Sequence, residues 1–160
     1  MEIFSDTYFM QQALREANEA FAANEVPVGA ILVSQDRIIA RAHNSVELLK
    51  DVTAHAEMIA ITSAMQHLGS KYLPECTLYV TLEPCPMCAG ALKWSQIGRI
   101  VYGAGDDKGG FMRFGKEMLH PATQLEFGIM HEECSTLLKS FFTEKRRISA
   151  IQGSRNHIPI

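Results

Sequence analysis

The sequence lacks the features that place a protein in or across a membrane. No apolar run approaches the ~20 residues that a spanning helix requires. The first ten residues contain Glu2 and Asp6 and have no basic stretch followed by an apolar core, so they do not resemble a signal peptide. We therefore expect a cytoplasmic protein with no membrane partner.

A strong charge of one sign and low-complexity tracts are also missing. The formal net charge is only −3, which argues against a protein coated with positive charge but leaves room for a local basic patch. Hydrophobic residues make up 47% of the chain and charged residues 21%, as in ordinary globular domains. We expect residues 1–147 to form one domain with its own core and residues 148–160 to be a loosely held C-terminal tail.

The positions of the cysteines matter more than their number. The four cysteines, Cys76, Cys85, Cys88 and Cys134, are an even count that invites a disulfide interpretation. Without a secretion signal, a Cys-x-x-Cys pair such as Cys85 and Cys88 is more often a metal or redox site.

Hydrophobic periodicity predicts helices and strands in an order typical of an α/β fold. Helices are expected from about residue 6 up to a break at 24–27, and over 54–68, 85–96 and 132–147. Strands are expected at 29–34 and 38–42, which form a hairpin, and at 77–82, 99–102 and 125–130. Segments 43–53 and 103–115 are expected to be loops, the second of them mobile. This order predicts a three-layer α/β/α sandwich with a central mixed sheet.

Two short segments carry residues suited to binding zinc, 54–57 (Ala-His-Ala-Glu) and 83–88 (Glu-Pro-Cys-Pro-Met-Cys). Cys85 and Cys88 are three residues apart at the start of a predicted helix, so their sulfurs fall on the same face. The positive end of that helix favours the thiolates that a metal needs. His55 supplies a third ligand, and three protein ligands with one open position are the pattern of a catalytic zinc site.

Glu57 is the candidate general acid and base beside that site. Two thiolates, one neutral imidazole and Zn²⁺ sum to zero charge, so a water on the metal can ionise near pH 7 and attack an electrophilic carbon. Another group must take the proton from that water and pass it to a departing amine. Helical residues two apart do not share a face, so Glu57 need not compete with His55 for the metal.

Other interpretations of these residues stay open. The Cys-x-x-Cys pair alone fits a redox site, although the thioredoxin-like context is absent. A structural zinc would need Cys76 or Cys134 as a fourth ligand. Glu57 alone fits a first-turn acid favoured by the helix dipole, and the whole chain fits a zinc-stabilised binding module without activity.

The motif pair His55-Ala56-Glu57 and Pro84-Cys85-Pro86-Met87-Cys88 resembles the signature of the cytidine deaminase-like superfamily. Over about residues 6–147 the chain also resembles the bacterial tRNA-specific adenosine deaminase family. The segments that carry this resemblance are 25–30 (EVPVGA), Asn44, 53–57 (TAHAE), 78–83 (LYVTLE) and 89–91 (AGA). The resemblance implies a homodimer with one zinc per chain. It implies hydrolytic deamination of adenosine to inosine at the wobble position of a tRNA anticodon, with Glu57 as the proton shuttle.

The same resemblance implies substrate contacts. Asn44 is expected to hydrogen-bond the base, and Val28 and Ala54 are expected to lie beside it. Asp106 and Lys108 are expected to approach the nucleotide or its neighbours. Taken without the resemblance, Asn44 fits a turn residue and 106–108 fits a solvated surface loop.

Two departures from the family pattern favour a different substrate. Many relatives have Lys-Thr-Gly and a longer stretch after it, where this chain has Lys108-Gly109-Gly110 and a short segment before the final helix. Trp94 resembles an aromatic residue that guanine deaminases carry at that position. A free-base or nucleoside deaminase, acting on guanine or cytosine, is therefore the alternative. The basic cluster Lys145-Arg146-Arg147 favours RNA, because phosphate contacts need only a few such residues, but it also fits the dipole of a helix C-terminus.

Apolar positions near the metal motif are candidates for the dimer contact. They are Met87, Leu92 and Trp94, all on the helix predicted over 85–96. These side chains equally fit an ordinary core.

Overall fold

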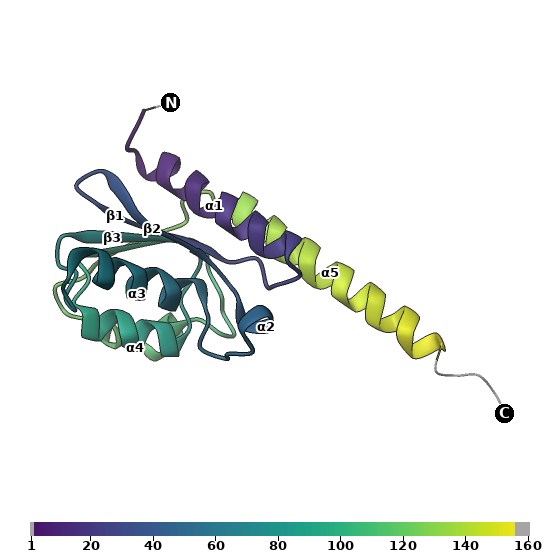
Figure 1. Ribbon diagram of the computed structural model, residues 1–160. Helices are drawn as coiled ribbons and strands as arrows, with labels where there is room; N and C mark the ends of the chain where they lie inside the picture. Colours follow the sequence, from purple (N-terminus) through teal and green to yellow (C-terminus); the bar gives the residue numbers. More distant parts are fainter. Residues whose placement is uncertain (1, 156–160) are drawn as a thin grey trace.

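A five-stranded mixed sheet lies at the centre of the computed structural model, which describes residues 2–155 (Figure 1). Its strands are, in chain order, β1 (Gly29–Ser34), β2 (Arg37–His43), β3 (Cys76–Leu82), β4 (Arg99–Ala104) and β5 (Gln124–Phe127). In the order β2-β1-β3-β4-β5, β1 is antiparallel to β2 and to β3, whereas β3, β4 and β5 are parallel. The predicted mixed sheet is confirmed.

Helices cover both faces of this sheet, as Figure 1 shows. The four long helices are α1 (Asp6–Ala22), α3 (Ala56–Leu68), α4 (Pro86–Ser95) and α5 (His131–Arg155). α1 and α5 pack on one face, and α3 and α4 pack on the other. Side chains alternate along β1, so that Ala30 and Leu32 join the core under α3 while Ile31 and Val33 join the core under α1. The predicted three-layer sandwich is confirmed.

The close packing of α1 on β1 depends on local details. The Ser5 hydroxyl accepts the Tyr8 N–H and caps the start of α1. A Cβ on Gly29 would overlap the backbone of α1 at Ala13, so only glycine permits this approach. The Thr81 hydroxyl accepts the Gly29 N–H at 3.1 Å and links β1 to β3.

The C-terminal helix is longer than the sequence predicts. The expected end at residue 147 is wrong, because α5 continues to Arg155. No glycine or proline interrupts residues 148–152, and Glu144 pairs with Arg147 one turn along the exposed side of the helix. Residues 156–160 of the expected tail lie outside the described residues. Within residues 2–155, no helix is long and apolar enough to cross a membrane.

The two expected loops contain regular structure. Segment 43–53 includes the short helix α2 (Val46–Leu49). Segment 103–115 includes the end of β4 and the 3-10 helix η1 (Phe111–Phe114), and a second 3-10 helix, η2 (Lys116–Met118), follows it. The Phe111 side chain is fully buried in the sheet core, which anchors this segment.

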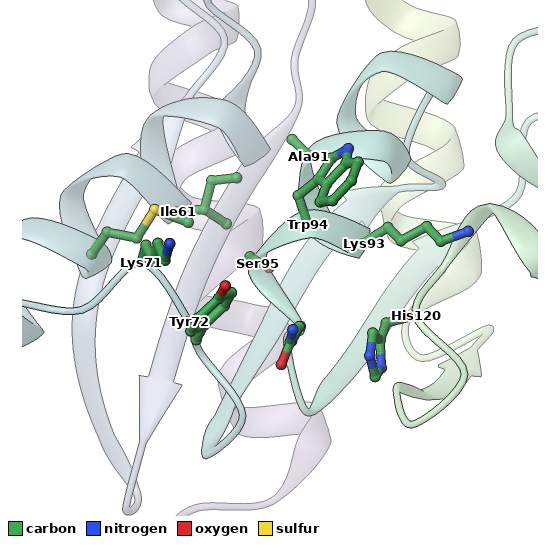
Figure 2. A pocket seen from close by; sticks show the side chains of 10 residues that line it. Ile61, Lys71, Tyr72, Ala91, Lys93, Trp94, Ser95 and His120 are labelled. Carbon is green, nitrogen blue, oxygen red and sulfur yellow. The ribbon is translucent and has the colours of Figure 1, made fainter.

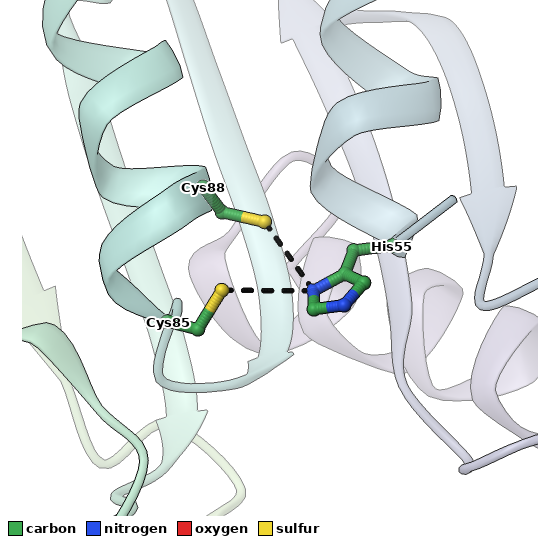
Figure 3. A group of neighbouring side chains, drawn as sticks. All are labelled: His55, Cys85 and Cys88. Carbon is green, nitrogen blue, oxygen red and sulfur yellow. Dashed lines mark hydrogen bonds between the residues drawn. The ribbon is translucent and has the colours of Figure 1, made fainter. Parts of the chain in front are cut away.

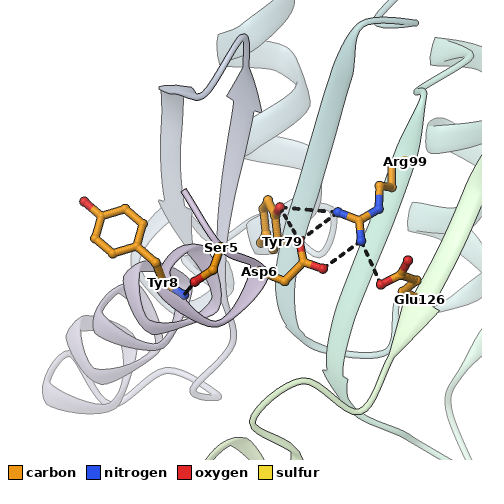
Figure 4. Close-up of polar contacts among 6 residues, drawn as sticks. All are labelled: Ser5, Asp6, Tyr8, Tyr79, Arg99 and Glu126. Atoms are coloured by element: carbon orange, nitrogen blue, oxygen red, sulfur yellow. Dashed lines mark hydrogen bonds and ion pairs between the residues drawn. The ribbon is translucent and has the colours of Figure 1, made fainter. Parts of the chain in front are cut away.

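A polar network fastens α1 to the parallel strands (Figure 4). The Arg99 guanidinium donates to both oxygens of Asp6 at 2.8 Å and pairs with Glu126 at 2.7 Å. The Tyr79 hydroxyl donates to Asp6 at 2.7 Å. The hydrogen bond from Arg99 holds the pKa of Asp6 below its ordinary value.

Replacing Asp6 with Asn is expected to lower the free energy of unfolding by about 1–3 kcal/mol at neutral pH, toward the lower end because the pair is partly exposed. Asp6 has a lowered folded pKa, so its stabilisation is present above the unfolded pKa of about 3.9 and is lost as pH falls through the folded value. Urea unfolding should show a constant difference between wild type and variant from about pH 7 to pH 5, shrinking below about pH 4. A difference that stays constant down to about pH 2 would contradict this account.

Candidate active site

The three predicted zinc ligands meet where two helices begin (Figure 3). His55 is the N-cap residue of α3, Cys85 is the N-cap residue of α4, and Cys88 lies in the first turn of α4. The chain returns through β3 between the two helices, so both helix starts lie at the same edge of the sheet. His55 Nδ1 is 3.6 Å from each sulfur, and the three ligand atoms lie within 4.8 Å of one another.

The donor set and its spacing fit zinc. Zn–S distances of about 2.3 Å and Zn–N distances of about 2.1 Å place two ligands of a tetrahedron about 3.6 Å apart. This is the spacing between His55 Nδ1 and both cysteine sulfurs. In the described part of the chain no fourth cysteine or histidine joins this group, since Cys76 starts β3 and Cys134 lies in the core under α1. Three ligands are the number typical of a catalytic zinc site.

The pKa values of the three candidate ligands are shifted by their mutual contacts. Hydrogen bonds from Cys88 and then from His55 lower the pKa of Cys85 to about 4. The contact with Cys85, together with burial, raises the pKa of Cys88, and the Cys85 contact also raises the pKa of His55. A cation bound here would hold both sulfurs as thiolates in place of a proton.

Glu57 lies beside the metal ligands and is not one of them. It is the second residue of α3, only 4% of it is exposed, and it lines the same cavity as His55 and Cys85. Burial raises the pKa of Glu57 above its ordinary value, because the carboxylate has lost its water. Such a carboxyl group is suited to take up a proton and pass it on near neutral pH.

A cavity of about 740 Å³ opens beside these groups, within the range that holds a nucleoside-sized ligand. Of the predicted substrate contacts, Val28, Asn44 and Asp106 line this cavity. Ala54 and Lys108 do not: Ala54 is buried next to His55, and Lys108 is exposed on the loop surface.

Asn44 has a structural contact and a free donor. Its Oδ1 accepts the Ala56 N–H at 2.9 Å at the start of α3, and its own N–H donates to the Val28 carbonyl at 3.1 Å. Among the described residues, Nδ2 of Asn44 has no hydrogen-bond partner. Because the oxygen is committed to a backbone donor, Nδ2 is the group that Asn44 offers to a ligand in the cavity.

Several residues that line the cavity were missed as site residues by sequence reasoning. Among them, Glu25 and Glu83 are buried acids, and Phe141 and Phe142 come from α5. The sequence showed Glu83 only as part of segments 78–83 and 83–88, and it gave no signal that Phe141 and Phe142 belong to a site. No spacing in the sequence brings these residues together, because they come from separate elements.

Trp94 does not reach this cavity. It is 82% exposed on α4 and lines a separate cavity of about 600 Å³ with Ile61, Tyr72 and His120 (Figure 2). Although Trp94 resembles an aromatic residue of guanine deaminases, its ring does not lie at the zinc site of this chain.

The fold and the site together define a zinc-dependent deaminase. The family model for the cytidine and deoxycytidylate deaminase zinc-binding region matches residues 4–104. The tRNA-specific adenosine deaminase of Aquifex aeolicus is 49% identical over 144 residues, which cover 87% of this chain and 95% of that protein. This chain belongs to the tRNA-specific adenosine deaminase family.

Solved structures agree with the fold, and one of them agrees with the family as well. A structure from studies of A-to-I editing by tRNA:A34 deaminases at the wobble position matches with a TM-score of 0.78 and 44% identity, covering 82% of this chain and 99% of that chain. The guanine deaminase of Nitrosomonas europaea matches with a TM-score of 0.73 at 24% identity, covering 86% of this chain and 84% of that chain. At this identity the second likeness shows the fold alone.

Proposed function

We propose that this protein hydrolyses the amino group of adenosine at the wobble position of a tRNA anticodon and leaves inosine. The observation that carries the proposal is the buried Glu57 beside a His-Cys-Cys triad at a cavity of nucleoside size. The Aquifex aeolicus relative and the tRNA:A34 deaminase structure support the same substrate. A tRNA substrate also supports a cytoplasmic location.

The proton transfers fall to Glu57. When bound, zinc supplies a Lewis acid that makes water a nucleophile near neutral pH. Glu57 accepts a proton from the water and donates a proton to the amino group as the C–N bond breaks. The water oxygen stays on the ring carbon and ammonia leaves. The raised pKa of Glu57 favours its protonated form, which the departing amine requires.

The substrate contacts follow from the cavity walls. Nδ2 of Asn44 donates to the base, and Val28 packs against its apolar face. Asp106 faces the ribose or a neighbouring nucleotide from the opposite rim. Ala54 acts by supporting the adjacent His55, and the exposed Lys108 contacts a phosphate outside the cavity.

The positions of the basic residues on α5 support contacts with RNA. Lys145 lines the active-site cavity, and Arg146 lines a neighbouring cavity of about 520 Å³ together with Lys139. Arg147 is instead paired with Glu144 at 2.6 Å. A base in a single-stranded loop reaches such a cavity without the cost of breaking a base pair, while its phosphates stay at the basic rim.

An anticodon stem-loop RNA tests the proposal, with inosine formation as the readout. Replacing Lys145 and Arg146 together with Ala is expected to weaken binding about tenfold and to reduce the slope of log affinity against log salt by about 1.4, because two phosphate contacts are lost. Arg147→Ala is the matched control and should change neither the affinity for the RNA nor the salt dependence of binding. Turnover of free guanine with an inert stem-loop would instead establish the free-base alternative.

We propose that two copies of the chain associate through the outer faces of α3 and α4. Trp94 is 82% exposed and Met87 is 38% exposed there, whereas Leu92 is fully buried in the core and contributes nothing to such a contact. Sedimentation at micromolar concentration should show a dimer for wild type and a monomer for Trp94→Glu with its zinc retained. A monomeric wild type would refute the contact.

A further inference from the structure

A buried carboxylate contributes to holding one part of the active-site cavity lining. Glu83 is 7% exposed, and its two oxygens accept the N–H groups of Asp106 at 3.3 Å and of Met112 at 3.2 Å. Glu83, which follows the last residue of β3, thereby binds both ends of the 106–112 loop. A Cβ on Gly110 would overlap the Glu83 carboxylate, so this loop can close over Glu83 only with glycine at that position.

A second part of the cavity lining is held in the same way. Glu25 is 2% exposed, and its oxygens accept the N–H groups of Glu47 at 2.8 Å and of Leu48 at 2.9 Å. These donors belong to the first turn of α2, whose N-cap residue, Ser45, makes no side-chain capping bond. Glu25, which is distant in the sequence, therefore accepts the free N–H groups at the start of α2 as a capping residue would. These hydrogen bonds hold α2 beside the cavity.

We infer that Glu25 and Glu83 are positioning residues that set the shape of the cavity and thereby the fit of the substrate. The inference rests on the proposed function for the identity of that substrate. Both carboxylates use one oxygen for each of two backbone donors, and neither is among the metal ligands. They act through the loops that they hold: Glu83 through Asp106, and Glu25 through Val46 and Glu47, all of which line the cavity.

A carboxamide tests this role, because its single oxygen accepts one N–H and its NH₂ group opposes the other. Glu83→Gln should speed amide hydrogen exchange at Asp106 or Met112 at least tenfold, with Glu47 and Leu48 unchanged. Glu25→Gln should give the reverse pattern. In both variants KM for an anticodon stem-loop should rise about tenfold or more while kcat changes less than about threefold, and zinc content should equal that of wild type.

Gly110→Ala tests the Glu83 contact by a second route that leaves the carboxylate in place. It should reproduce the exchange pattern and the KM effect of Glu83→Gln, and it serves as the test of this contact if Glu83→Gln fails to fold. Glu19→Gln, an exposed acid on α1, is the matched control and should behave as wild type.

Two results would overturn the inference. One is a fall in kcat at constant KM, and the other is exchange that rises across the whole protein in place of the named amides. An inactive wild type would refute the proposed function but not the positioning role, because the local exchange pattern does not depend on turnover.

Discussion

Glu57→Gln is expected to abolish turnover while leaving the fold and the metal in place. The amide is close in size to the carboxyl group and fits the same buried position, but it can neither accept the proton of the attacking water nor return one to the leaving amine. General acid and base catalysis commonly supplies about 10²–10⁴-fold in rate, and in the proposed mechanism Glu57 serves both transfers. We therefore expect kcat to fall by at least about 10²-fold.

Three measurements on the same preparation decide this role. They are zinc content, thermal unfolding and the rate of inosine formation. A drop in kcat of less than about tenfold with zinc intact would be too small for a residue that performs both proton transfers. The wild-type carboxyl group has a raised pKa because it is buried, and exchange for the neutral amide removes that cost, so the variant should be no less stable than wild type.

Cys88→Ala is expected to lose most of its zinc and, with it, all measurable activity. The Cys88 sulfur is one of only three protein ligands in the group, and removing it leaves His55 and Cys85 with too few donors for tight binding. Metal that binds the folded state stabilises it, so the variant should also unfold at a lower temperature than the zinc-loaded wild type.

Cys134→Ala is the matched control for this experiment. Cys134 is as buried as Cys88, but it lies in the core under α1, on the other face of the sheet from α4. The control should keep one zinc per chain, and any loss of stability should come only from the small cavity that the substitution creates. Full zinc retention in Cys88→Ala, together with zinc loss in Cys134→Ala, would refute the ligand assignment.

Most of the fold was predictable because its signals are local. The hairpin of β1 and β2, the buried run that forms β3 and the apolar period of α1 each arise within a short window of sequence. The end of α5 was not predictable in this way, because the apolar residues Ile148 and Ile151 in its last turns are too few to mark a helix. α2 was hidden for a related reason, since its cap comes from Glu25, some twenty residues earlier in the chain.

The sequence by itself determined the chemistry of this protein. The spacing of Cys85 and Cys88, together with His55 and Glu57 at another helix start, is sufficient to predict a catalytic zinc and its proton shuttle, because each motif occupies a single turn. The tertiary structure alone decided what surrounds that chemistry. It placed Lys145 and Arg146 at two cavities and paired Arg147 with Glu144. It also left Trp94 outside the active-site cavity and built two buried glutamates, Glu25 and Glu83, into the walls of that cavity. These features depend on contacts between residues far apart in the chain, and a periodic pattern in one sequence does not encode which distant residues meet.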